Sequence, residues 1–178
     1  MSLLIPSLSH FLHLLATVVW IGGIVMILLV ILPGAKAALE ASPMVSRLMK
    51  EITKRFTPIA NISILVLIFT GVVIAHYEKN FTSVLDFNNT WNVILFIKHL
   101  LVALMIVTHF YRGLILNPKI GRLSSQVNES QVTSSLSSQV VKLQKFSLNL
   151  VKTNFVLGLI VLLFTGILSS YNLIRDVS

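Results

Sequence analysis

The chain of 178 residues contains no cysteine and few charged residues. Without cysteine it can form no disulfide, thiolate metal site, iron–sulfur cluster or cysteine nucleophile, so any transition metal must be held by imidazole, thioether, carboxylate or backbone oxygen. Charged residues make up 11% of the chain, against about 25% in a soluble domain. Hydrophobic residues make up 55%, and the mean hydropathy is +0.88. This composition is typical of a protein embedded in a lipid bilayer.

Acidic residues are especially scarce, and none lies inside a long apolar run. The six acids fall in polar connections or near the C-terminus: Glu40, Glu51, Glu78, Asp86, Glu129 and Asp176. Catalysis by a pair of carboxylates is therefore excluded, and a proton-driven transporter with a buried carboxylate relay is disfavoured. Serine-hydrolase and phosphate-loop motifs are also absent.

Four long apolar segments account for the hydrophobicity. They cover residues 8–32, 57–76, 91–116 and 154–173. At 1.5 Å per residue in a helix, each can cross a hydrocarbon layer of about 30 Å. The first is too long for the apolar region of a signal peptide, so no cleaved signal is expected, and Pro33-Gly34 is predicted to end it. We therefore predict an all-α integral membrane four-helix bundle that forms a single domain over 1–178.

Basic residues are concentrated in two of the connections. Ten of the fourteen lie in these connections or in the last turns of the third segment: Lys36, Arg47, Lys50, Lys54, Arg55, Arg112, Lys119, Arg122, Lys142 and Lys145. The positive-inside rule places these connections in the cytoplasm and both termini on the extracytoplasmic side of the cell membrane. We predict amphipathic helices over 35–56, continuous with the second span, and over 120–146, with a disordered loop as the alternative for the latter. The expected partners are the bilayer and other membrane subunits, not nucleic acid.

Alternating passes bring four of the five histidines to the extracytoplasmic end. These are His10, His13, His76 and His99. Histidine is rare inside a bilayer and usually functional there. The four imidazoles are predicted to form a metal or haem site, and the set would suit copper. The alternative is a b-type haem, which needs two neutral imidazoles at one depth and would take His13 with His99 or His76.

Lys98 is unusual because an ammonium inside a bilayer costs about 2.5–3.5 kcal/mol on insertion scales. It either snorkels outward, pairs with an anionic group such as a haem propionate, or neutralises and moves protons. His109 lies about 15 Å deeper than His99, and packing is the preferred account of it. Met26 and Met105 are too deep to join the external histidines.

The first span resembles the opening helix of the copper-resistance protein D (CopD) membrane family. The resemblance rests on His13-Leu-Leu-Ala-Thr-Val-Val-Trp20-Ile-Gly22-Gly23. Phe69-Thr-Gly71 and Leu157-Gly-Leu-Ile-Val-Leu-Leu-Phe-Thr-Gly166 are similar to later elements of that family. The resemblance implies copper uptake or handling at the membrane and leaves the ligands open.

The chain is also similar to the HemJ-type protoporphyrinogen oxidases. His13 before Trp20, Lys54-Arg55, and Lys98 with His109-Phe-Tyr-Arg-Gly113 carry this similarity. It implies a haem-binding protein for whose function the matched histidine and lysine are important. Three hypotheses follow: a copper-binding or copper-transporting protein, a haem b redox protein or enzyme, and an accessory subunit of a larger membrane complex.

Overall fold

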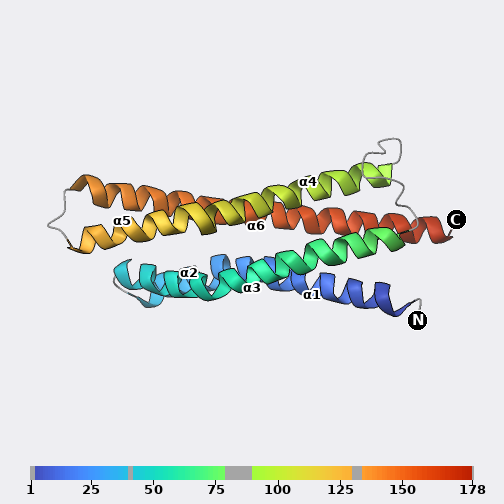
Figure 1. The fold of residues 1–178 in the computed structure, drawn as a ribbon, viewed down its shortest axis with the longest axis horizontal. Coiled ribbons are helices and arrows are strands. Elements are labelled where there is room, and N and C mark those ends of the chain that lie inside the picture. Colours follow the sequence, from blue (N-terminus) through green and yellow to red (C-terminus); the bar gives the residue numbers. More distant parts are fainter. Residues whose placement is uncertain (1–2, 40–41, 79–89, 130–133, 178) are drawn as a thin grey trace. The chain divides into compact units, whose positions relative to one another are not determined.

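The computed structural model describes residues 3–39, 42–78, 90–129 and 134–177, nearly all of them helical. The elements are α1 (Leu4–Met26), η1 (Ile27–Ile31), α2 (Leu32–Ala38), α3 (Ser42–Tyr77), α4 (Thr90–Tyr111), η2 (Arg112–Leu116), α5 (Asn117–Glu129) and α6 (Ser134–Val177) (Figure 1). Four continuous helical stretches are long and apolar enough to cross a membrane: Leu4–Ala38, Met44–Tyr77, Thr90–Val127 and Leu136–Ser170. The all-α class and the four membrane-length helices predicted from the sequence are confirmed.

Pro33-Gly34, which were predicted to end the first span, do not end its helix. The helix continues through both residues to Ala38 because the π-helical turn η1 comes directly before them. Proline offers no amide N–H, and in a regular α-helix its ring would collide with the carbonyl four residues earlier. In the wider π turn the Leu32 amide donates to the Ile27 carbonyl. This geometry moves the carbonyl four residues before Pro33 away from the proline ring.

A second π-helical turn has the same effect in the third span. η2 ends two residues before Pro118, and the Asn117 amide donates to the Arg112 carbonyl. The helix therefore runs on past the predicted end at residue 116 as α5. The predicted connection over 120–146 is thus divided between α5 and the start of α6, and its residues 130–133 lie outside the described residues. The predicted helix leading into the second span is confirmed from Ser42 onward.

The chain divides into two compact units. The first comprises residues 1–99 with 162–178, and the second comprises residues 100–161. In the first unit α1 packs against α3. The single-domain interpretation stays a prediction.

The backbone of α1 comes very close to α3 at Gly23. A Cβ atom placed there would lie 2.1 Å from a ring carbon of Phe56, whereas a Cβ atom at Gly22 would have nothing within 4 Å. Gly23 therefore permits the close packing of the two helices, as small residues do between membrane helices.

Substitution of these two glycines tests the packing. Gly23→Ala is expected to lower the free energy of unfolding by about 1–3 kcal/mol, because the Phe56 ring must move to avoid overpacking. Gly22→Ala, the matched control, has space for the methyl group and is expected to raise it by about 0.5–1 kcal/mol, the gain in helix propensity. Denaturant unfolding in detergent micelles measures both, and equal stabilities would contradict the close contact.

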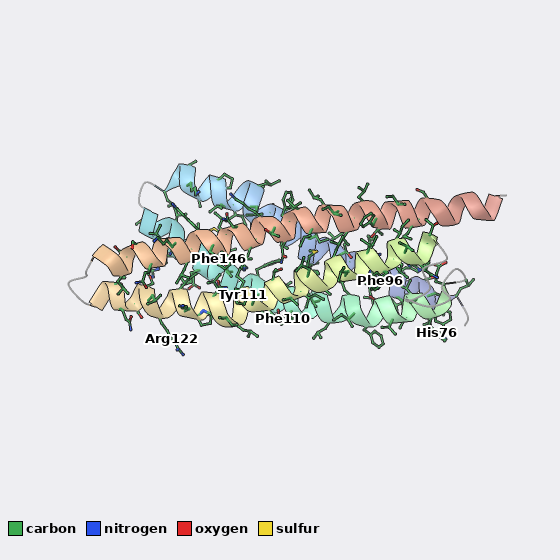
Figure 2. The ribbon with its side chains drawn as sticks, turned by 90° about the horizontal axis from the view of Figure 1, so that it is seen from above. His76, Phe96, Phe110, Tyr111, Arg122 and Phe146 are labelled. Carbon is green, nitrogen blue, oxygen red and sulfur yellow. The ribbon has the colours of Figure 1, made fainter. Side chains whose placement is uncertain are left out.

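The outer surface of the helices is apolar. Phe69 and Leu114 are each 72% exposed, and many other large aliphatic side chains are exposed as well. Figure 2 shows such side chains projecting along the whole length of the helices. A water-soluble protein would bury most of this surface, so it fits contact with lipid.

Candidate functional site

The inner face of α1 carries the deepest of the external histidines. His13 and Thr17 are half-buried on this face, and Trp20 is buried. The Thr17 hydroxyl donates to the His13 carbonyl at 2.8 Å, so it is satisfied within its own helix. This face of α1 therefore packs inward, and it brings the His13 imidazole to α3.

The His13 imidazole is bonded to Thr70 of α3. Its Nδ1 lies 2.8 Å from the Thr70 Oγ1, and the same hydroxyl donates to the Val66 carbonyl at 2.7 Å. A hydroxyl has one proton, and a carbonyl oxygen can only accept. When the Thr70 proton is directed to the Val66 carbonyl, Thr70 accepts from the His13 Nδ1–H. Neutral His13 therefore keeps a free lone pair on Nε2.

Thr70 and its neighbour fix the surroundings of this imidazole. Thr70 is 1% exposed, so its bond to His13 is shielded from lipid and water. A Cβ atom at Gly71 would lie 3.7 Å from the His13 Cε1, which shows that the imidazole lies directly against the backbone of α3. Thr70 was not among the candidate residues predicted from the sequence. Its signal was the Phe69-Thr70-Gly71 motif at the depth of His13.

The structure brings three more predicted residues into the neighbourhood of His13. His10, Lys98 and His99 all interact with it electrostatically. The His99 Nδ1 lies 2.7 Å from the Leu95 carbonyl, so this nitrogen donates, which in neutral His99 leaves the lone pair on Nε2. Both His10 and His99 are exposed. In this arrangement the imidazoles of His13 and His99 both carry their proton on Nδ1.

His76 is not among the groups that interact with His13. It is exposed near the end of α3, with its ring edge-on to Tyr77 at 5.4 Å between centroids (Figure 2). Among the described residues, no group of three or more histidine, cysteine or acidic side chains is placed to hold a metal ion together. The ligand set of His10, His13, His76 and His99 stays a prediction.

A second polar contact joins α4 to α6 in the other unit. Thr108 donates to the Asn154 Oδ1, and the Asn154 Nδ2 donates to the Met105 carbonyl at 3.2 Å. Asn154, Met105 and the neighbouring His109 are all buried. Hydrogen bonds of this kind hold membrane helices together. The sequence reasoning did not identify Asn154, although it is an amide at the very start of an apolar span.

We expect the Asn154 contact to contribute modestly to stability. Asn154→Leu is expected to cost about 0.6–1.7 kcal/mol, the range measured for interhelical hydrogen bonds in a membrane bundle. Ser170→Ala is the control, because that hydroxyl donates only within its own helix, to the Gly166 carbonyl at 3.0 Å. Unfolding in micelles measures both changes. A stability of Asn154→Leu equal to that of the control would contradict the contact.

Comparison with known protein families identifies the group to which this chain is related. Residues 50–168, well over half of the chain, match the family model of copper resistance protein D (CopD). No curated protein and no solved structure matches. The match begins in α3 and ends in α6, so it includes Thr70, Lys98 and His99 but not His13. The resemblance of the first span and the similarity to HemJ-type proteins lie beyond what this match tests, and they stay predictions.

The match and the four membrane-length helices agree on the class of protein. A chain with four such helices and apolar outer surfaces crosses the membrane several times. The protein therefore belongs to the copper resistance protein D (CopD) family of multi-pass membrane proteins.

Proposed function

We propose that this protein binds copper at its extracytoplasmic end, with the His13 Nε2 as a ligand, and moves it into the membrane. Copper is the substrate in this proposal. The observation that carries it is the chain of hydrogen bonds from His13 through Thr70 to the Val66 carbonyl, which leaves Nε2 free. Membership of a family named for copper resistance supports the choice of metal.

The arrangement of His13 suits a metal ligand. A metal-binding histidine usually donates its other ring N–H to an oxygen, which fixes the tautomer and the orientation of the ring. Thr70 accepts from His13 in this way, and the Leu95 carbonyl accepts from His99. Imidazole nitrogen is a common ligand for copper. Because Cu(I) accepts two ligands, we propose the His99 Nε2 as the second ligand, beside the His13 Nε2.

Lys98 supports a second candidate, a b-type haem. Its ammonium interacts electrostatically with His13, so it would repel a copper ion but attract a carboxylate such as a haem propionate. In this case His13 would be an axial ligand through Nε2 and Lys98 would hold the propionate. When bound, haem would supply one-electron redox chemistry.

Substitution of Lys98 separates the two candidates by the sign of its effect. Lys98→Gln is expected to tighten copper binding severalfold if copper is the substrate, because a nearby positive charge is removed. The same change is expected to weaken haem retention if haem is the ligand. Copper titration and absorption spectroscopy measure the two outcomes, and weaker copper binding in this variant would contradict the copper site.

Copper flux into sealed vesicles tests the proposed function directly. Full-length protein is reconstituted in liposomes that contain a Cu(I)-sensitive dye. We expect protein-dependent entry of Cu(I) that is lost in His13→Gln and kept in Thr57→Val, whose hydroxyl donates only to the Thr53 carbonyl within α3, at 2.7 Å. Flux equal to that of empty vesicles, or flux unaffected by His13→Gln, would contradict the proposal.

A further inference from the structure

We infer that α4 carries a second Cu(I) site, formed by the Met105 thioether and the His109 imidazole. This inference rests on the proposed function, because an ion that enters at the outer end must still cross the inner half of the membrane. Along α4, Met105 and His109 lie seven and eleven residues beyond Lys98, about 10 and 16 Å along the helix axis.

Both side chains are removed from lipid. Met105 is 1% exposed and His109 is 7% exposed, whereas Leu104 and Val107 of the same turns are 48% and 63% exposed. A buried histidine in a membrane helix is a functional candidate by default. The four-residue spacing places the two side chains next to each other on one face of the helix. The same spacing lets two histidines of one helix share a metal ion.

Helix α6 lies against this turn of α4. The buried Asn154 donates from Nδ2 to the carbonyl of Met105, at 3.2 Å, and accepts from Thr108. Both bonds fall within the two turns that carry the methionine and the histidine. The pair therefore lies at a helix–helix contact inside the second unit, where polar ligands for an ion are expected in a membrane protein.

The chemistry of the pair favours Cu(I). Thioether and imidazole are ligands for soft or borderline ions, and Mg²⁺ or Ca²⁺ would need oxygen ligands. The sequence has no acid in its apolar segments to supply them. Arg112, one turn beyond His109, interacts with it electrostatically. Its positive charge weakens cation binding, which suits a site that must release its ion onward.

X-ray absorption at the copper edge tests this site through its sulfur ligand. Full-length His13→Gln protein in micelles, which lacks the outer ligand, is loaded with one equivalent of Cu(I). We expect sulfur scattering from the bound copper. It should disappear in His13→Gln/Met105→Leu and remain in His13→Gln/Met26→Leu, since Met26 is 52% exposed in α1. Leucine conserves the volume of methionine, so folding should be kept.

Two further variants complete the test. His109→Gln on the same background is expected to lower Cu(I) affinity at least tenfold in chelator competition, and Arg112→Gln is expected to raise it. Absence of sulfur scattering, or sulfur scattering that survives Met105→Leu, would overturn the inner site. If instead the outer proposal alone is wrong, His13→Gln will leave the wild-type copper content unchanged while Met105→Leu still removes the sulfur signal.

Discussion

Replacement of His13 by glutamine is expected to lower the copper affinity of the outer site by at least about 100-fold. Loss of a partner that only orients a ligand already costs about 10–100-fold, so loss of the ligand itself should cost more. Glutamine can still donate to the Thr70 hydroxyl, which keeps the contact between α1 and α3. Competition with a Cu(I) chelator on the purified full-length protein measures the change.

His76→Gln is the matched control for this variant. His76 is exposed and, unlike His10, Lys98 and His99, is not among the groups that interact with His13. We expect its affinity for copper to equal that of the wild type. A comparable loss in both variants would favour the four-histidine ligand set predicted from the sequence. An unchanged affinity in His13→Gln would contradict the site.

Replacement of Thr70 by valine should have the second largest effect, a loss of about 10–100-fold in copper affinity. Valine has nearly the shape of threonine but no oxygen to accept from the His13 Nδ1–H. The proton is then free to move to Nε2, where it blocks the metal. Thr70→Ser keeps the hydroxyl and is expected to bind copper almost as the wild type does.

The tautomer of His13 gives a readout of Thr70 that needs no metal. Nitrogen NMR shifts of the imidazole should report a protonated Nδ1 in the wild type and in Thr70→Ser, and a mixed population in Thr70→Val. Thr57→Val is the control, since Thr57 bonds only within α3. If valine and serine at position 70 give the same affinity and the same shifts, the positioning by Thr70 is contradicted.

The number of spans could be predicted from the sequence, whereas their ends could not. Apolar length decides whether a helix can cross a bilayer, and that length is visible in the residues alone. Pro33 was expected to end a helix because proline is incompatible with α-helical geometry. The π turns Ile27–Ile31 and Arg112–Leu116 locally replace that geometry. No residue pattern in the sequence announced them.

The candidate site was predictable in depth but not in its contacts. Counting residues from the span ends placed His10, His13 and His99 at one end, and the structure does bring His10 and His99 within electrostatic range of His13. Counting does not fix how each helix is rotated about its axis, because rotation depends on packing. The bond between His13 and Thr70 depends on that rotation, as does the exposure of His99.

The copper content and absorption spectrum of the purified full-length protein test the central claim most directly. The account predicts that protein from copper-supplemented membranes retains copper in stoichiometric amount, shows no haem band on reduction, and loses the outer copper in His13→Gln. A reduced-minus-oxidised haem band, or protein that retains neither copper nor haem, would contradict it.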